Sequence, residues 1–144
     1  MKRRVLIADD DPDILDLVSA SMRQAGADVM SVTSGAELLE RLAEDGAFDL
    51  VISDVAMPWM TGVEVARSLR AAGLEVPVIL MTAFRTAALA EEIRSLGGRT
   101  ALLPKPFDPD ELDAAIELLF SDASQTSLEP TQVPRPLPRA AGDR

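Results

Sequence analysis

A short apolar run that ends in an aspartate constrains this chain more than any other stretch. Leu50, Val51 and Ile52 follow one another without a polar residue, and Ser53 and Asp54 come directly after them. A strand with one solvent-facing side alternates apolar and polar residues, so this run predicts a strand buried on both faces. In open parallel sheets the functional groups collect at the carboxyl ends of the strands. Asp54 is therefore predicted to lie at the functional edge of a sheet.

Further apolar runs alternate with segments in which apolar residues recur at helical spacing. They predict strands at 5–8, 28–32, 76–81 and 100–103. Capping residues precede the predicted helices, and Ser34–Glu37 and Thr61–Glu64 both have the spacing of a capping box. Five strand–helix alternations predict an α/β fold. We expect a five-stranded parallel sheet in the flavodoxin-like order 2-1-3-4-5, with helices on both faces.

The composition changes near Asp122. The last part of the chain is rich in Ser, Thr and Pro and has no aromatic residue, so it cannot bury enough surface to offset its ordering entropy. We expect one folded domain over 1–121 and a disordered Pro-rich tail or linker stub over 122–144. No apolar run is long enough to span a membrane and no signal peptide is visible, which predicts a cytoplasmic protein without a membrane partner.

The residue types that are missing narrow the chemistry. The chain has no Cys and no His, which excludes disulfides, thiolate or imidazole metal sites and His-based catalysis. The formal net charge is −10, and an acidic domain repels a phosphate backbone, so direct nucleic-acid binding is not expected. Crowded carboxylates do, however, attract a hard cation.

The predicted strand ends carry a consistent set of polar side chains. Asp9 and Asp10 follow the first strand, Asp54 ends the third, Thr82 follows the fourth and Lys105 follows the fifth. Because the carboxyl ends of parallel strands lie at one edge, these residues are predicted to meet in one pocket.

Three carboxylates in one pocket predict a divalent cation between them. Mg²⁺ is the expected ion, since it takes an all-oxygen shell with few protein carboxylates and keeps positions for water and a phosphoryl oxygen. We expect Asp10 and Asp54 to bind it directly and Asp9 mostly through water. The backbone carbonyl of Ala56 is expected to complete the protein ligands.

The same pocket is suited to phosphoryl transfer. Asp54 is predicted to attack phosphorus as a carboxylate nucleophile. Lys105 and the metal are expected to stabilise charge on the transferring oxygens, where most phosphoryl-transfer catalysis arises. Thr82 is expected to donate a hydrogen bond to the phosphoryl group.

Four motifs in this order resemble the receiver domain of two-component response regulators, over about residues 2–121. They are Asp9-Asp10, Asp54 with Met57-Pro58 and Gly62, Met81-Thr82-Ala83, and Lys105-Pro106-Phe107. The resemblance implies that a histidine kinase or a His-containing phosphotransfer protein donates phosphate to Asp54, with Mg²⁺, and that a docking surface for a downstream protein then switches. It also implies a cis bond before Pro106 and no enzymatic activity beyond the chain's own phosphorylation and slow dephosphorylation. Phosphorylation-dependent dimerisation is left open.

The chain departs from the family pattern at three positions. Leu102 stands where the family usually has Tyr or Phe, the residue that reports phosphorylation to the surface around the last helices. Ala56 and Phe84 occupy the positions two past Asp54 and two past Thr82, which tune hydrolysis in this family, and neither can orient a water molecule. We therefore predict slow self-dephosphorylation.

Two other functions are kept as alternatives. Asp11-Pro-Asp13 resembles the Asp-x-Asp signature of Mg²⁺-dependent phosphatases of the haloacid-dehalogenase type, but no further acidic pair follows Lys105 on a strand. A degenerate receiver that acts as an interaction module without phosphate is the second alternative, and Leu102 keeps it open. Whether the chain stands alone or is the N-terminal part of a longer regulator is also left open.

Overall fold

The computed structural model of the chain describes residues 2–121, and strands and helices alternate throughout this range. In chain order the elements are β1 (Arg4–Ala8), α1 (Pro12–Gln24), β2 (Asp28–Val32), α2 (Gly35–Glu44), β3 (Leu50–Asp54), α3 (Gly62–Ala71), β4 (Val78–Thr82), α4 (Ala87–Leu96), β5 (Thr100–Pro104) and α5 (Pro109–Phe120). The predicted tail at 122–144 lies outside the described residues, so its boundary and its disorder stay predictions.

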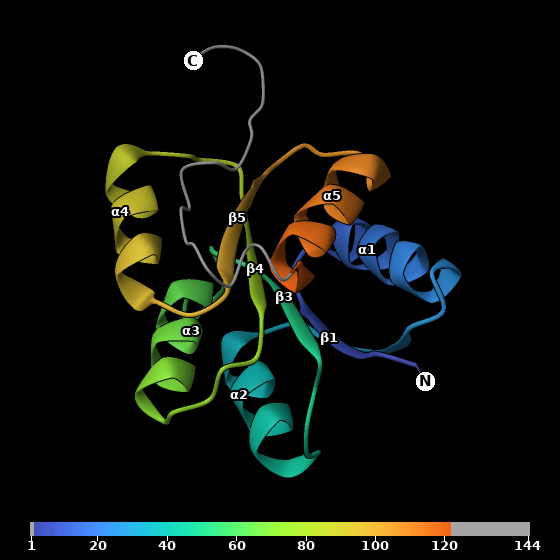
Figure 1. Cartoon of the computed structure of the whole chain (residues 1–144), viewed down its shortest axis with the longest axis horizontal. Coiled ribbons are helices and arrows are strands. Elements are labelled where there is room, and N and C mark those ends of the chain that lie inside the picture. Colours follow the sequence, from blue (N-terminus) through green and yellow to red (C-terminus); the bar gives the residue numbers. More distant parts are fainter. Residues whose placement is uncertain (1, 122–144) are drawn as a thin grey trace.

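The five strands form one parallel sheet in the order β2-β1-β3-β4-β5 (Figure 1). The predicted fold class and strand order are therefore confirmed. β3 lies in the middle of the sheet, and all five of its residues are buried. β2 lies at one edge and keeps two exposed residues, which fits its weaker apolar pattern. Because the chain passes from β2 across β1 to β3, the carboxyl ends of β1 and β3 lie side by side at the middle of one rim.

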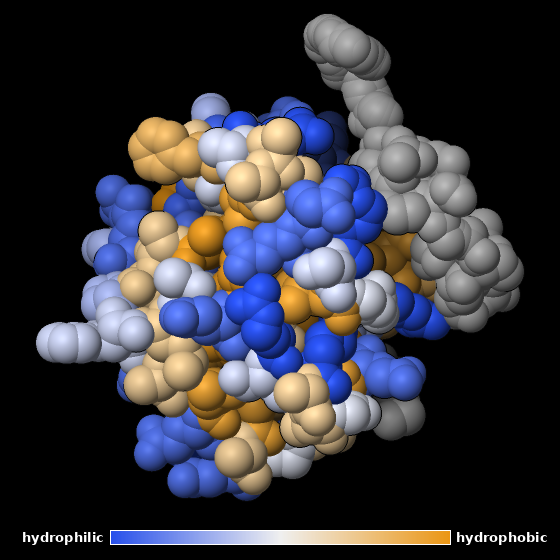
Figure 2. Space-filling view, turned by 90° about the vertical axis from the view of Figure 1, so that its left-hand side faces the viewer, coloured by the Kyte–Doolittle hydropathy of each residue, from blue (hydrophilic) through white to orange (hydrophobic). Residues whose placement is uncertain are grey.

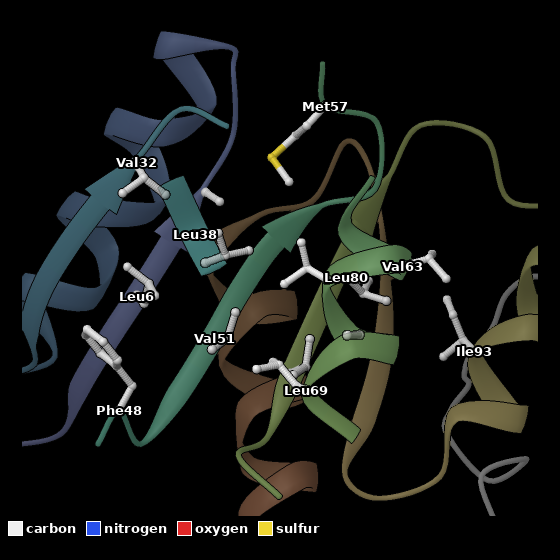
Figure 3. Close-up of a cluster of buried hydrophobic side chains, with 14 residues drawn as sticks. Leu6, Val32, Leu38, Phe48, Val51, Met57, Val63, Leu69, Leu80 and Ile93 are labelled. Atoms are coloured by element: carbon white, nitrogen blue, oxygen red, sulfur yellow. The ribbon is translucent and has the colours of Figure 1, made fainter. Parts of the chain in front are cut away.

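Each face of the sheet has its own hydrophobic core. On one face, side chains of α2, α3 and α4 pack against the sheet around Leu6, Val51 and Leu80 (Figure 3). On the other face, α1 and α5 cover Ile7, Ile52 and other strand residues. The side chains of consecutive strand residues thus point into opposite cores. Both sets are apolar, so the strand sequences are apolar without alternation.

Side chains at the predicted caps fix where the helices begin. Thr61 and Glu64 form a reciprocal capping box before α3, as do Asp108 and Glu111 before α5. At α2 only one of the two hydrogen bonds of the predicted capping box forms, so the prediction is half wrong. The Ser34 hydroxyl accepts from the backbone N–H of Glu37, but the Glu37 carboxylate accepts from the backbone and hydroxyl of Thr33, one residue before the cap.

The fourth strand begins two residues later than predicted. Val76 and Pro77 precede β4, and the Pro77 carbonyl accepts a hydrogen bond of 2.9 Å from the Val51 N–H. Proline has no N–H to donate to a neighbouring strand, so regular pairing starts after it. Within residues 2–121, no helix is long and apolar enough to cross a membrane.

The side of the molecule that carries α3 and α4 has a mixed surface. Hydrophilic and hydrophobic residues are interspersed over it (Figure 2). Near the N-terminus, two arginines make cation–π contacts. The Arg3 guanidinium lies 4.0 Å from the centroid of the Phe120 ring in α5, and the Arg4 guanidinium lies 4.4 Å from the centroid of the Phe48 ring.

Candidate functional site

The sheet brings the predicted polar residues to one rim. Ala8 pairs with Ser53 and Asp54 pairs with Met81, so Asp9 and Asp54 follow at the same level of neighbouring strands. Thr82 ends β4 and pairs with Pro104, the residue before Lys105. Asp9, Asp54 and Thr82 are all buried although they are polar.

The Lys105 ammonium links two strand ends. Its Nζ atom lies 3.1 Å from Asp9 Oδ2 and 3.1 Å from Asp54 Oδ1. The peptide bond between Lys105 and Pro106 is cis, as the resemblance implied. The other oxygen of Asp9 accepts from the Asp11 N–H at 2.9 Å, so this carboxylate is held from both sides.

Three carboxylates form the acidic part of the pocket. One oxygen from each of Asp9, Asp10 and Asp54 can be chosen so that all three lie within 4.8 Å of one another. Asp9 and Asp54 are buried, whereas Asp10 is exposed at the entrance. Lys105 is the basic group bonded to this cluster, so one ammonium faces three carboxylates among the described residues.

The electrostatics of the pocket reflect this shortage of positive charge. Burial raises the pKa of Asp54, the hydrogen bond from Lys105 lowers it, and the charges of Asp9 and Asp10 raise it again, with a net increase. Burial alone lowers the pKa of Lys105, but its hydrogen bonds to Asp54 and Asp9, together with the negative charges of these carboxylates, raise it, and the net shift is upward. The pocket thus stabilises the protonated, charged form of Lys105, whereas it destabilises the ionised form of Asp54.

This pattern fits a hard cation. The donor atoms are carboxylate oxygens in close quarters, and Mg²⁺ prefers such donors. An added divalent charge would relieve the repulsion that raises the pKa of Asp54. Ala56 lies two residues past Asp54 on the β3–α3 loop. That its backbone carbonyl is a fourth ligand of the metal stays a prediction.

Ser53 and Gly62 hold the backbone of Asp54 through contacts that the sequence analysis did not predict, although it included Gly62 in the motif of Asp54. The Ser53 hydroxyl donates to the Asp54 carbonyl at 3.0 Å. Gly62 packs so closely that a Cβ there would lie 2.3 Å from the same carbonyl oxygen. The Gly62 N–H also donates to the Val55 carbonyl at 2.9 Å, which closes the loop after the strand. A glycine at the start of α3 is the sequence signal for such a close approach.

The Thr82 hydroxyl is engaged with the loop that follows it. It accepts from the Phe84 N–H at 3.0 Å and lies 3.3 Å from the Phe84 carbonyl, to which it donates. The two aromatic residues of the neighbouring loops, Trp59 and Phe84, are 97% and 79% exposed. Trp59 has a φ of 70°, a left-handed conformation that few large residues adopt.

Asp11 belongs to the helix and not to the pocket. Its side chain caps α1 by accepting from the Asp13 N–H at 2.9 Å, and both residues are exposed. Neither belongs to the acidic cluster found within residues 2–121. The Asp-x-Asp pattern that suggested a phosphatase is therefore a helix N-terminus.

Fold and site together define a flavodoxin-like α/β protein with an acidic pocket and a paired lysine at the carboxyl edge of its sheet. The family model of the response regulator receiver domain matches residues 5–117. The chain belongs to this family. Neither the phosphatase nor the interaction module without phosphate is favoured by these findings.

Named relatives agree with this assignment. The chain is 38% identical over 117 residues to the response regulator protein PmrA of Pseudomonas aeruginosa, which covers 81% of this chain and 52% of PmrA. It is 32% identical to the alkaline phosphatase synthesis transcriptional regulatory protein PhoP of Bacillus subtilis, with 83% of this chain and 49% of that protein covered. The chain spans about half the length of these curated relatives.

Solved structures share the fold. The chemotaxis response regulator CheY4 of Vibrio cholerae superposes with a TM-score of 0.74 at 30% identity, covering 83% of this chain and all of that one. The beryllofluoride-activated receiver domain of DrrB from Thermotoga maritima gives a TM-score of 0.72 at 28% identity, covering 83% of this chain and 97% of that one.

The raised pKa of Asp54 predicts a gain in stability when its charge is removed. The folded protein binds this proton more tightly than the unfolded chain, so stability falls as pH rises from the ordinary carboxylate pKa through the raised one. In metal-free buffer, Asp54→Asn should therefore unfold at higher urea than the wild type at pH 7, and the difference should shrink near pH 4. Urea titrations at both pH values measure it.

Asp16→Asn is the matched control for this prediction. It makes the same charge change at an exposed position of α1, outside the cluster. A wild-type midpoint that equals or exceeds that of Asp54→Asn at pH 7 would contradict the electrostatic account of the pocket.

Proposed function

We propose that this chain is a phosphoacceptor and that Asp54 receives the phosphoryl group. The observation that carries the proposal is the Lys105 ammonium 3.1 Å from Asp54, inside a cluster of three carboxylates at the rim of a receiver fold. This arrangement offers a nucleophilic oxygen, a fixed positive charge and oxygen ligands for a metal in one place. Catalysis of phosphoryl transfer depends mainly on positioning the reacting groups and on stabilising the charge of the transition state.

The residues have distinct roles in the proposed step. An Asp54 carboxylate oxygen forms a bond to phosphorus as the bond from phosphorus to the donor's histidine nitrogen breaks, and the electron pair stays on that nitrogen. Lys105 neutralises charge on the transferring oxygens. Asp9 holds Lys105 in place through the second contact of 3.1 Å. Asp9, Asp10, Asp54 and the Ala56 carbonyl would hold Mg²⁺, which supplies further charge stabilisation when bound.

The proposed partners follow from the family. Response regulators interact with histidine kinases and with downstream effectors, and we propose a histidine kinase or a His-containing phosphotransfer protein as donor here. The relatives PhoP of Bacillus subtilis and ZraR of Escherichia coli are named transcriptional regulatory proteins, so our expectation of no direct nucleic-acid contact is not confirmed. That expectation concerns this acidic chain only. We also propose a cytoplasmic location and slow dephosphorylation, while phosphorylation-dependent dimerisation is left open.

A turnover assay separates this function from that of a phosphatase. We expect acetyl phosphate with Mg²⁺ to label the chain once per molecule, and p-nitrophenyl phosphate to give no sustained release of nitrophenol. Repeated turnover of p-nitrophenyl phosphate that is lost in Asp54→Asn would instead identify a phosphatase and contradict the proposal.

The metal prediction concerns stability as well as chemistry. A ligand that binds the folded state at a concentration 100 times its Kd stabilises that state by about 2.7 kcal/mol. We expect Mg²⁺ to raise the unfolding temperature of the wild type and Asp10→Asn to lose most of that gain at the same Mg²⁺ concentration, because one carboxylate of the cluster is gone. Calorimetric scans with and without Mg²⁺ measure both effects.

The exposed Asp16 again supplies the matched control, since Asp16→Asn makes the same charge change away from the cluster. It should keep the full Mg²⁺ effect. An equal loss in both variants would mean that the ion acts through general screening and not through this site.

A further inference from the structure

A groove with an apolar interior lies between α1 and α5, on the face of the sheet opposite α2, α3 and α4 (Figure 1). Its volume is about 480 Å³, and the buried side chains that line it include Val5, Met22, Leu50 and Ile116. Pockets that enclose small ligands have volumes of about 300–1,000 Å³, so this groove has room for more than one side chain. The strand residues that line it come from the beginnings of β1 and β3, so the groove lies at the edge of the sheet away from Asp54.

The side of the groove that α5 forms is acidic. Asp113 and Glu117 line it, and both are exposed. They are four residues apart, so they point to the same side of the helix. All charged residues of α5 are acidic, and neither of these two has an ion pair or a side-chain hydrogen bond within residues 2–121. Arg3, the one basic residue of the lining, stacks on the Phe120 ring, so two carboxylates of the groove lack a basic partner.

The charges of the chain change sign beyond the described residues. Between Lys105 and Arg135 every charged residue is acidic, whereas the segment 133–139 has two arginines and no acid. In this arginine–proline segment, Arg135 and Arg139 flank Leu137, and prolines occupy alternate positions. Because proline fixes φ, such a segment loses less conformational entropy on binding than an ordinary one. The segment thus combines an apolar side chain with two positive charges, which complements the groove.

The chain is long enough for the arginine–proline segment to return to the groove. Glu117 lies in the last turn of α5, about 5 Å along the axis from the end of the helix. Arg3 lines the groove and contacts Phe120 in that last turn, so the groove extends to the end of α5 where the described chain stops. Residues 122–132 connect this end to the segment, and a linker of about ten residues spans ~17 Å on average.

We propose that the arginine–proline segment 133–139 docks into the groove between α1 and α5 of the same molecule. Leu137 packs against the apolar interior, and the two arginines pair with the carboxylates on the α5 side. A segment that cannot form a core of its own can still bind a surface that is already formed. Because a short linker joins the two parts, their effective concentration is on the order of millimolar, so weak contacts suffice. The docked segment covers the acidic side of α5 and competes with any partner that binds there. This inference does not depend on the proposed function of Asp54.

A single spin label tests this docking in the full chain. The sequence has no Cys, so Ala140→Cys gives one attachment site for a nitroxide, directly after the segment. We expect the nitroxide to broaden the NMR amide signals of Gly26 and Ile116, which line the groove, several-fold more than those of Gly46 and Ala47. The latter two lie on the loop after α2, a helix of the opposite face. The same protein with the nitroxide chemically reduced is the reference.

Two sets of variants separate the charged contacts from the apolar contact. In the spin-labelled protein, Asp113→Asn with Glu117→Gln should remove most of the broadening at the groove. Leu137→Ser alone should do the same, because it removes the apolar side chain and keeps both arginines. Asp16→Asn with Glu75→Gln makes the matched charge change at exposed positions outside the groove and should keep the broadening.

A mixture distinguishes docking within one molecule from docking between molecules. Isotope-labelled chain without a nitroxide is mixed with unlabelled chain that carries it, and we expect no broadening at the groove. Broadening in the mixture as strong as in the spin-labelled chain itself would mean that a second copy supplies the segment, which overturns the proposal. Broadening that is equal on both faces, absent, or unchanged by the variants of groove and segment overturns it as well.

Discussion

Replacing Lys105 by methionine is expected to slow phosphorylation of Asp54 by acetyl phosphate about a hundredfold to a thousandfold, the usual effect of removing one preorganised donor from a site of developing charge. The ammonium lies 3.1 Å from Asp54 and is largely buried, so water cannot replace it well. Methionine keeps most of the length and the packing of the lysine stem. Initial rates of labelling at saturating Mg²⁺ measure the effect.

The control for this prediction is Lys105→Arg. It keeps the charge but replaces a compact ammonium by a planar guanidinium, so an intermediate rate is expected. Circular dichroism of each variant establishes that it is folded under the assay conditions. A labelling rate for a folded Lys105→Met within threefold of the wild type would mean that Lys105 is structural and not part of the reaction.

Replacing Gly62 by alanine is expected to destabilise the fold by about 3 kcal/mol, the upper part of the usual range for overpacking. The new Cβ would lie 2.3 Å from the Asp54 carbonyl and 3.0 Å from Ser53 Oγ. The carbonyl is backbone of the central strand and cannot rotate away. Either α3 moves outward or Asp54 is displaced, so the labelling of Asp54 should fall together with stability. Urea unfolding curves measure the loss of stability.

Gly26→Asn is the control for this steric argument. Gly26 has a φ of 93°, and a Cβ added there would meet nothing within 4 Å. The position therefore favours glycine for its backbone conformation and not for lack of space. Asparagine tolerates left-handed backbone better than most residues, and a loss below about 1 kcal/mol is expected. If Gly62→Ala costs no more than Gly26→Asn, the close packing of α3 on Asp54 is not a constraint.

The sequence predicted the fold well because its patterns were local and consistent. Apolar runs without alternation indicated strands buried on both faces, and capping residues marked where the helices begin. Side chains placed at strand ends then had to share a rim in a parallel sheet. For this reason the proximity of Asp9, Asp54 and Lys105, which are far apart along the chain, could be expected from the sequence alone.

Other features of the site depend on three-dimensional detail that no pattern encodes. The capping box at Ser34 failed in one half because the Glu37 carboxylate has two nearby donors on Thr33, and a motif cannot say which it takes. The support of the Asp54 carbonyl by Ser53 depends on a side-chain rotamer. The link from Thr82 to Phe84 is likewise a matter of which way a hydroxyl points.

The most direct test of the account is the site of covalent labelling. The wild-type chain is incubated with acetyl phosphate and Mg²⁺, and the acyl phosphate is trapped with a hydride reductant and mapped by peptide mass spectrometry. We predict a single modified residue, Asp54, with no labelling when Mg²⁺ is removed by chelation or when Asp54 is replaced by alanine. Label on another residue, or an unmodified Asp54 under conditions that label a known receiver domain, would contradict the claim that this carboxylate accepts the phosphoryl group.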